Sequence, residues 1–565
     1  MGLKTSAPVL LAVMVSACSG GRGTPPAQAP PPQSATQNQI NAVPRDKVQD
    51  GGKFTWPLDS MPANFNYYEL DGTPLDGYHV LAALLPTPYT NDAASAPIWN
   101  RDLLISEPKL TSEPKQVVTY EINPKAIWYD GTPITWEDFY WQWKSSNGTN
   151  KAYQIASSNG YEDIENVEKG KDTCEVVVTF KHKYADWTNV FNPFYPASTN
   201  KDPKIFNEGW KDRPLTTAGP FKLDSIDATS KTITLVRNEK WWGDRAKLDT
   251  IVFRVIEPNA QIDALANGEI DAMDNGSDAN KYRRAKGISG TEVRVAGGPN
   301  FTHLTFNATS ANLQDVRVRQ ALAMGIDRSA IAKALLGPLN IDAKTLNNHI
   351  FMANQDGYQD NAGDVGGYNP ERARQALDQA GWKLDGNVRK KDGKPLQLTL
   401  VIPGGIATSK QTAELVQNML GQIGVAMSIS AVPVSDFFDK YVRPGQFDLV
   451  LFSWIGTAYP ISSSKSIYAK PGRDAKGEMI IRQNYARIGS DEIDRLFDQA
   501  NQELDRKKAV VLANQIDALI WQEVHSLTVY QRPELVICKK NLANFGAFGF
   551  MQPWVYQDIG WAKTS

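Results

Sequence analysis

The chain is poor in the residues that build metal sites and nucleophiles: its 565 residues include three cysteines and five histidines. No C-x-x-C pair and no H-E-x-x-H helix occurs, so the sequence predicts no zinc site. The G-x-S-x-G elbow of α/β-hydrolases and the G-x-x-x-x-G-K-S/T loop of ATPases are also missing. We therefore expect no enzyme activity, no catalytic residues and no cofactor.

Neither sign of charge is in excess, because 60 basic residues face 62 acidic ones and the net charge is −2. Nucleic acid binding would call for a clustered basic excess, so no nucleic acid partner is expected. The composition is otherwise that of an ordinary soluble protein, and the length implies more than one lobe. The 15 tryptophans, 20 tyrosines and 20 phenylalanines suit a core and also a cleft that holds a ligand between aromatic rings.

No apolar run reaches the roughly 20 residues that a membrane-spanning helix needs. The amino terminus instead has Lys4, a short apolar run and then the sequence Val-Ser-Ala-Cys ending at Cys18. This pattern predicts a lipoprotein signal peptide over residues 1–18, with a lipobox that places a lipid on Cys18. We expect a protein anchored by this lipid to the extracytoplasmic face of the cell membrane. The other cysteines, Cys174 and Cys538, could pair outside the cell or stay free, and the sequence leaves both open.

Residues 19–50 are rich in glycine, proline, glutamine, serine and alanine. Such a segment cannot bury enough apolar surface to fold, so we predict a disordered tether between the lipid and a folded body.

The body alternates short strands and helices, which predicts a mixed α/β fold. Strands are expected where β-branched and aromatic residues gather, at 116–122, 174–180, 231–236 and 251–256. Helices are expected from periodic apolar residues and end signals, at 261–267, 315–334, 369–381, 411–424, 491–501 and 506–520.

The run from Trp128 to Phe139 reads WYDGTPITWEDF. Asp130 and Gly131 supply a turn, and Thr135 caps a helix whose third residue is Asp138. The whole string also resembles the W-x-D-G-x-P-x-T-x-x-D-F/V signature of family 5 solute-binding proteins, the peptide- and nickel-type receptors of ABC importers.

Further motifs resemble the same family and occur in its order. They are TAGPF at 217–221, RNEKWW at 237–242, ALANGEID at 264–271, DVRVRQAL at 315–322, YNPERA at 368–373, and FD at 447–448 before SW at 453–454. The resemblance covers residues 50 to 560. Within the family, the chain is similar above all to the oligopeptide-binding lipoproteins of actinobacteria. Most of these motif residues are expected to shape the fold without touching a ligand.

The resemblance implies a two-lobed periplasmic-binding-protein-like fold of type II, cluster C, with an additional third domain. Lobe II would span 301–530 and the extra domain 86–212. Lobe I would be discontinuous and combine 51–85, 213–300 and 531–565. The chain would cross between the lobes near Thr305–Asn307 and near Tyr530–Arg532, and these crossings would act as a hinge.

A binding site is expected at the end of the buried strand that begins at Leu449. In peptide receptors of this family the backbone here pairs with an extended peptide, a form of β-augmentation. The residues concerned would be Ser453, Trp454, Ile455, Gly456 and Thr457. Family members carry an aspartate at the position of Thr457, which holds the peptide's ammonium group. Because a neutral hydroxyl cannot make that charge-assisted bond, the resemblance leaves open a longer, blocked or non-peptide ligand.

Candidates elsewhere are less specific. On lobe I, Asn66 could offer an amide and Tyr67 or Tyr68 a stacking face, or the tyrosines could be a core pair. On lobe II, Asn347 and His349 form a polar cluster, and His349 could contact ligand or cap a turn.

We therefore expect a monomeric solute-binding lipoprotein that passes an oligopeptide to the permease and ATPase subunits of an ABC importer. Two alternatives stay open at this stage. The same fold could bind an oligosaccharide, a nickel chelate or a glycolipid headgroup, or the protein could regulate envelope synthesis without transport.

Overall fold

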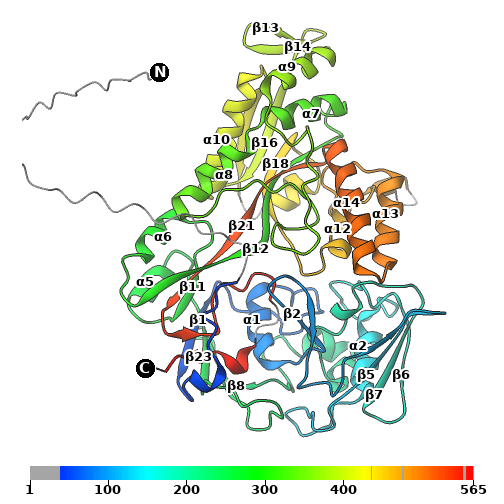
Figure 1. Ribbon diagram of the computed structural model, residues 1–565, viewed down its shortest axis with the longest axis vertical. Coiled ribbons are helices and arrows are strands. Elements are labelled where there is room, and N and C mark those ends of the chain that lie inside the picture. Colours follow the sequence, from blue (N-terminus) through cyan, green and yellow to red (C-terminus); the bar gives the residue numbers. More distant parts are fainter. Residues whose placement is uncertain (1–37, 434–435, 474–475, 552–554, 564–565) are drawn as a thin grey trace, which may run out of the picture.

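The computed structural model describes residues 38–433, 436–473, 476–551 and 555–563. The predicted signal peptide, Cys18 and most of the predicted tether lie outside these residues. The described chain forms an α/β body in which two large parts meet across a boundary, with β12 and β21 running from one part to the other (Figure 1). The predicted fold class is confirmed.

The lower part holds the expected lobe I and extra domain. In lobe I a four-stranded sheet has the order β1 (Lys53–Leu58), β10 (Thr250–Val255), β9 (Thr232–Arg237), β8 (Phe221–Asp227). In the extra domain a second sheet has the order β4 (Lys109–Thr111), β5 (Val117–Glu121), β7 (Glu175–Phe180), β6 (Ile164–Lys169). Strands β5, β7 and β9 alternate between more and less buried residues, as expected when one sheet face packs on a core. All four predicted strands are confirmed.

Helix α2 (Trp136–Ser146) begins as the sequence predicts. The Thr135 hydroxyl accepts a hydrogen bond from the Glu137 amide, and the Asp138 carboxylate accepts one from the Thr135 amide at 2.8 Å. Asp138 also accepts from the indole of Trp128, so the motif packs the helix onto the preceding strand end. Burial raises the pKa of Asp138 to about 6.

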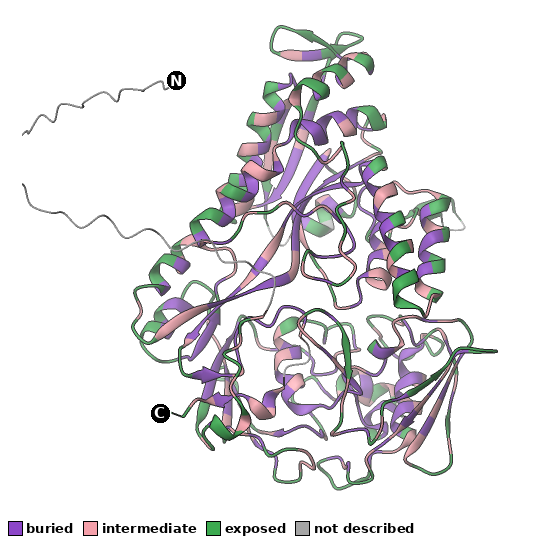
Figure 2. Ribbon diagram, in the orientation of Figure 1, coloured by how far each residue is buried: buried purple, intermediate pink, exposed green. Residues whose placement is uncertain are grey.

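The upper part, lobe II, is built on a six-stranded sheet. Its order is β11 (Ala272–Asp274), β21 (Ser526–Lys539), β12 (Thr291–Phe306), β18 (Leu449–Ile455), β16 (Gln397–Pro403), β17 (Ala426–Val432). Buried segments run through this sheet and the faces of the helices turned toward it, whereas the outer helix faces are exposed (Figure 2). The pattern predicted as one helix over 315–334 forms two, α7 (Val316–Gly325) and α8 (Arg328–Leu336), because Asp327 caps a new start.

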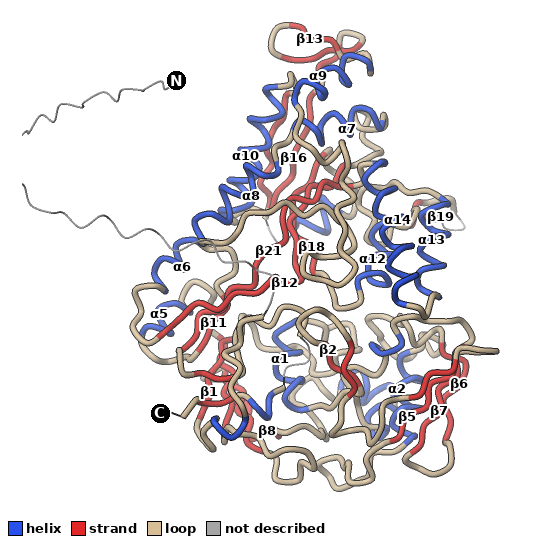
Figure 3. The backbone as a smooth tube through the Cα atoms, in the orientation of Figure 1, coloured by secondary structure: helices blue, strands red, loops and turns tan. Residues whose placement is uncertain are grey.

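The remaining elements connect these sheets (Figure 3). The helical ones are η1 (Arg45–Lys47), α1 (Leu75–Leu84), η2 (Trp187–Asn189), α3 (Ala197–Asn200), α4 (Pro203–Glu208), α5 (Gln261–Ala266), α6 (Ala279–Ala285), η3 (Gly337–Leu339), α9 (Pro370–Gln379), α10 (Ala407–Gln422), η4 (Phe437–Val442), α12 (Pro460–Tyr468), α13 (Asp491–Gln502), α14 (Arg506–Glu523) and η5 (Tyr556–Asp558). The short strands are β2 (Tyr89–Asn91), β3 (Pro97–Trp99), β13 (Lys383–Asp385), β14 (Val388–Lys391), β15 (Lys394–Pro395), β19 (Gly472–Arg473), β20 (Met479–Ile480), β22 (Leu542–Ala543) and β23 (Gly560–Trp561).

The two long strands β12 and β21 do not pair evenly along their length. The pairing of β12 with β21 is interrupted between Gly297 and Phe301, opposite the stretch from Gln531 to Pro533. By contrast, Thr305 pairs with both β18 and β21 inside lobe II. Pairing between the two long strands is therefore interrupted close to the crossing expected on β21, and the crossings near Thr305–Asn307 and Tyr530–Arg532 stay predictions.

The last part of the predicted tether, residues 38–50, packs against the folded body. Val48 is fully buried, and Gln39 and Val48 bridge to Ala547 and Ala562 near the carboxyl terminus. Composition misled the prediction here, since a few apolar residues suffice when the carboxyl-terminal segment supplies a partner.

Candidate functional site

The end of β18 has one paired edge and one free edge. Gly456 donates to the carbonyl of Pro299 at 3.0 Å, and Asn307 donates to the carbonyl of Asp448 at 2.9 Å, so even-numbered residues of β18 bond toward β12. Because backbone groups alternate along a strand, Leu451, Ser453 and Ile455 direct theirs to the other side.

That other side is covered by β16 only at the start of β18. The two strands pair at Leu449 and Val450, and no described strand pairs with the outer edge from Ser453 to Ile455. Unpaired backbone groups on an exposed edge are a template for another extended chain. The geometry of this edge is therefore suited to a strand-like ligand.

The side chains at this strand end differ in their surroundings. The Ser453 hydroxyl lies 3.2 Å from the hydroxyl of Thr302, while the side chain of Ile455 is 76% exposed. Trp454 is half-buried, and its ring is nearly parallel to those of Tyr485 and His303 at centroid distances of 5.6 and 5.8 Å. Burial lowers the pKa of His303 to about 3, so this neighbour of Trp454 is a neutral ring near neutral pH.

Gly456 and Thr457 lead from the strand to the boundary between the lobes. A Cβ at Gly456 would lie 2.4 Å from the carbonyl oxygen of Pro299, so a side chain there would clash. The amide of Gln355 donates to the carbonyl of Thr457 and to the hydroxyl of Ser95, each at 3.0 Å. Ser95 belongs to the β2–β3 hairpin of the extra domain, so Gln355 joins the predicted binding segment to the opposite part of the molecule.

Tyr459 makes a second link between the two parts. Its hydroxyl accepts from Thr188 at 3.3 Å and from Asn91 at 3.4 Å, and all three residues are buried. Nearby, the amide of Ala185 donates to the carbonyl of Asn501 at 2.8 Å. We call the Gln355–Ser95 and Tyr459–Asn91/Thr188 contacts the interlobe seam. The side chains that form it are all neutral.

A buried acid from the extra domain bonds to the helix that follows this segment. Asp186 bonds to Ser462 on α12, across the seam, and burial raises the pKa of its carboxyl. Thr457 itself carries no charge: its hydroxyl donates to Ser463 and accepts from the Tyr459 amide. Another polar group faces the crossing, because the buried side-chain oxygen of Asn300 has no hydrogen-bond partner among the described residues.

The candidates on lobe I are engaged in holding the fold. The Asn66 amide donates to the carbonyl of Phe206 at 2.8 Å and its oxygen accepts from the Tyr68 amide. The Tyr68 hydroxyl accepts from Gln142 and from Tyr161, and burial raises its pKa. These bonds tie the loop to the extra domain. Tyr67 packs on Tyr78, with ring centroids 5.3 Å apart, and stays partly exposed.

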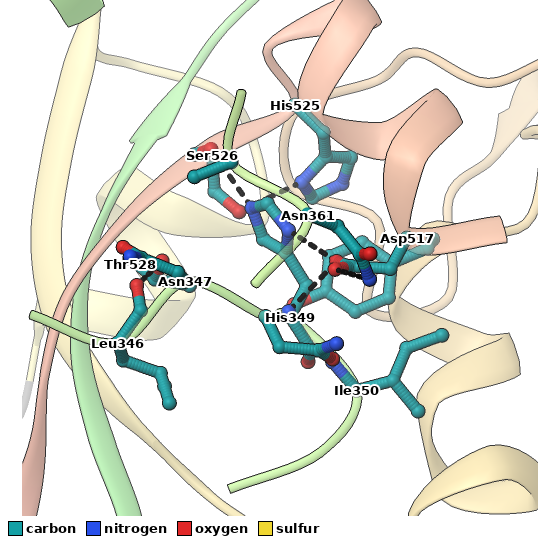
Figure 4. Close-up of polar contacts among 12 residues, drawn as sticks. Leu346, Asn347, His349, Ile350, Asn361, Asp517, His525, Ser526 and Thr528 are labelled. Atoms are coloured by element: carbon teal, nitrogen blue, oxygen red, sulfur yellow. Dashed lines mark hydrogen bonds and ion pairs between the residues drawn. The ribbon is translucent and has the colours of Figure 1, made fainter. Parts of the chain in front are cut away.

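His349 lies in the interior of lobe II. Its Nδ1 is 2.7 Å from the Asp517 carboxylate and its Nε2 is 3.0 Å from the carbonyl of Ser526 (Figure 4). Both ring nitrogens are therefore engaged within the fold. Both side chains of the pair are fully buried. The interior interpretation of His349 is thus favoured over a ligand contact.

Asn347 lines a pocket of about 310 Å³ within lobe II, together with Arg328, Asp360 and the glycines at 363–367. Its amide donates to the Asp360 carboxylate at 2.7 Å. The Arg328 guanidinium donates to the carbonyls of Leu346 and Thr528 and is bound to the chain around it. The side-chain amide of Asn347 is thus engaged with Asp360 within lobe II.

Among the described residues, no cluster of histidine, cysteine, aspartate and glutamate could hold a metal ion. Cys174 and Cys538 are both free. Within the same part of the chain, no helix combines the length and apolarity needed to span a bilayer.

The sequence did not single out several residues that the structure brings to this place. Gln355 and Ser95 lie in loops, Asn91 ends β2 and Thr188 lies in η2, and none belongs to a motif. Their partners are 102 to 368 residues away. Only Tyr459 carried a usable signal, since it closes the aromatic segment that runs from Phe452.

The family model for bacterial extracellular solute-binding proteins, family 5 Middle, matches residues 102–475. The chain belongs to this family. Family 5 proteins bind solutes for ABC transporters outside the cytoplasm and are not enzymes, and this chain has that solute-binding role.

Relatives of this family 5 protein match over nearly its whole length. The oligopeptide-binding protein OppA of Mycobacterium tuberculosis is 40% identical over 552 residues, covering 96% of this chain and 91% of that protein. The periplasmic EDTA-binding protein EppA has a TM-score of 0.85 at 25% identity, covering 93% and 99%. The oligopeptide-binding protein AppA of Bacillus subtilis, solved with a nonapeptide, has a TM-score of 0.72 at 22% identity, covering 92% and 100%. The fold is thus the type II periplasmic-binding-protein fold.

Proposed function

We propose that this protein captures an extracellular oligopeptide between its lobes and delivers it to the permease of an ABC importer. The observation that carries the proposal is the free outer edge of β18 from Ser453 to Ile455, which leads into the interlobe seam. The 40% identity to an oligopeptide-binding protein supports a peptide as the solute.

An edge of this kind recognises the ligand's backbone, which every peptide has. The amides and carbonyls of Ser453 and Ile455 would each bond to an extended ligand strand, and the exposed side chain of Ile455 would not obstruct it. Such binding tolerates many sequences. When the lobes meet, the seam residues would close over the bound peptide, and differential affinity for that arrangement would drive the closure.

The ligand's free amino terminus is not required at Thr457, because no carboxylate stands there. Acetylating the peptide's amino terminus should therefore change the affinity little. The exception would be a role for Asp186, whose carboxyl lies across the seam at Ser462. Suppose that acetylation strongly lowers the affinity for the unmodified protein, but that the variant Asp186→Asn binds the free and acetylated peptides equally. This result would assign the ammonium site to Asp186.

Calorimetric titration of one peptide in three forms tests the proposal. The free and acetylated forms should bind about equally, whereas a form N-methylated at the paired amides should bind much more weakly. Equal binding of the N-methylated form would contradict backbone pairing. Binding by none of the forms would contradict the peptide assignment itself.

The same proposal includes a lipid anchor at Cys18 and a monomeric receptor. Stable anchoring needs more than one acyl chain, which a diacylated cysteine supplies. The variant Cys18→Ala should appear in the soluble or secreted fraction, and a variant Cys174→Ala should stay with the membrane. Retention of the Cys18→Ala protein in detergent-extracted membrane would contradict the lipobox.

A metal chelate is the second candidate, favoured by the structural likeness to an EDTA-binding protein. Native mass spectrometry of the protein purified without refolding separates the two. A retained mass that fragments as a peptide supports the first candidate, and a retained metal complex supports the second.

A further inference from the structure

Four aromatic side chains gather on one face of β18 at its free end. Phe452 and Trp454 alternate with Ser453 along the strand, so they share a face. Phe438 on η4 lies 5.4 Å from Phe452, and Tyr485 lies 5.6 Å from Trp454, between ring centroids. We call Phe438, Phe452, Trp454 and Tyr485 the aromatic wall.

The wall is anchored on one side and open on the other. Phe452 and Tyr485 are 8% and 6% exposed and belong to a buried cluster with Phe437, Val401 and Val450. Phe438 is 36% exposed, and Trp454 is half-buried. Partly exposed rings on a packed base form a rigid apolar surface that gains from being covered.

The position of the wall relates it to the free edge. In paired strands, side chains directly opposite each other have Cβ atoms about 4.5–5.5 Å apart. A ligand strand on the outer edge of β18 therefore places one side chain beside Trp454, on the face that carries the wall. Phe438 belongs to η4, which packs on this same face through Phe452.

Two cationic side chains near the wall already have partners. Lys440 bonds to Asp436 at 3.0 Å, and Arg487 donates to the backbone carbonyl of Tyr485 at 2.7 Å. A charged ligand side chain would thus lose water without gaining a free partner among these groups.

We propose that the aromatic wall is a specificity subsite, which selects peptides with an aromatic or large apolar side chain at the position opposite Trp454. The inference rests on the proposed peptide function and deepens it. Backbone pairing at Ser453 and Ile455 gives general affinity, and the wall ranks peptides by one side chain.

A scan of one peptide backbone tests the proposal. Phenylalanine, leucine, alanine and aspartate are placed in turn at each position, and each peptide is titrated calorimetrically. At one position phenylalanine should bind about tenfold more tightly than alanine, and aspartate should bind more weakly still. At neighbouring positions the preference should vanish, because those side chains point to the other face.

Variants then assign the preference to the wall. Phe438→Ala should remove most of the advantage of phenylalanine over alanine while leaving the affinity for the alanine peptide nearly unchanged. Phe438→Leu should restore part of it, which would also show that the site is intact. Tyr368→Ala removes another exposed aromatic ring of lobe II, 44% exposed, and should behave as the unmodified protein.

Three outcomes are distinguishable. Peptides that bind with no preference at any position overturn the subsite and leave the proposed function standing. A preference that survives in both Phe438→Ala and Trp454→Ala also overturns it. If no peptide binds, the proposed function fails, and the subsite with it.

Discussion

Two sets of buried polar groups in this protein are built differently. In the interior of lobe II, Asp517 accepts from His349 at 2.7 Å and from the side chain of Asn361 at 2.8 Å, so both of its oxygens are engaged (Figure 4). At the interlobe seam, Tyr459 has neutral partners at 3.3 and 3.4 Å. His349, Asp517 and the residues of the seam are all buried.

The difference matches what each region has to do. A charge in the interior must keep its partners, since an unpaired buried charge is costly. Neutral groups at the seam cost less to separate, because water can replace each single hydrogen bond when the lobes part. The hydrogen bonds of the interior thus stay formed, whereas those of the seam can break when the lobes part. A receptor that takes up and releases a solute requires this difference.

The largest expected effect is on the interior. The variant Asp517→Ala would take the acceptor away from the buried His349 ring and remove the bonds to Asn361 and to the His349 amide. We expect a loss of about 3–5 kcal/mol in the free energy of unfolding. Urea unfolding followed by tryptophan fluorescence measures it.

Asp498→Ala is the matched control, since Asp498 on helix α13 forms an ion pair at the surface with Lys465 on the neighbouring helix α12. Its cost should be at most about 1 kcal/mol. A similar cost for both variants would remove the contrast between interior and surface charges in lobe II.

A second buried group, the carboxyl of Glu534, should make the stability of the protein depend on pH. Burial raises the pKa of Glu534 from 4.5 to about 7, although its carboxylate accepts from the Gly549 amide at 2.7 Å. The folded state therefore keeps a proton that the unfolded state loses, and stability falls as the pH rises from about 4.5 to 7. The contribution is at most about 3 kcal/mol.

The pH profile of Glu534→Gln tests this assignment. The variant should lack this part of the decline, so that its stability relative to the unmodified protein rises across the window and is level above pH 7. Parallel profiles for the two proteins over the window would contradict a buried, protonated Glu534.

Removing hydrogen bonds from the seam should change the stability of the protein little but its overall shape clearly. The double variant Tyr459→Phe, Ser95→Ala removes three hydrogen bonds, each with a net contribution of about 0.5–1.5 kcal/mol. We expect the unliganded protein to shift toward open lobes with a nearly unchanged melting temperature. Small-angle scattering should show a larger radius of gyration.

Tyr153→Phe is the control for this variant, because its hydroxyl bonds to the carbonyl of Asn200 within the extra domain. It should leave the radius unchanged. If the seam variant also kept its radius of gyration and its ligand affinity, the seam bonds would have no influence on the opening of the lobes.

Much of the fold followed from local signals in the sequence. Alternation placed β5, β7, β9 and β10, and the capping motif at Thr135 placed α2, because both depend on residues close together in the chain. The break between α7 and α8 was missed, since Ile326 continues the apolar pattern while Asp327 ends it locally. The folded stretch at 38–50 was missed because its partners lie near the carboxyl terminus.

The candidate site was predictable only in part. The strand end at 453–457 could be found from a buried run followed by polar and aromatic residues. The seam could not, because Tyr459 bonds to residues 271 and 368 positions away that belong to no motif. Asn66 and His349 looked like ligand residues, yet their amide and imidazole groups bond to the fold itself. The sequence shows which hydrogen-bonding group a residue carries, but not the group to which it bonds in the fold.

Hydrogen exchange at the end of β18 tests the central claim most directly. Residue-resolved exchange, by mass spectrometry with gas-phase fragmentation, compares the protein with and without a bound peptide. The amides of Ser453 and Ile455 face the free edge and should gain strong protection. Those of Phe452 and Trp454 bond toward β12 and should change little. Protection of Ser453 and Ile455 alone is the result expected of backbone pairing, and a bound peptide that leaves both amides exchanging as before would contradict it.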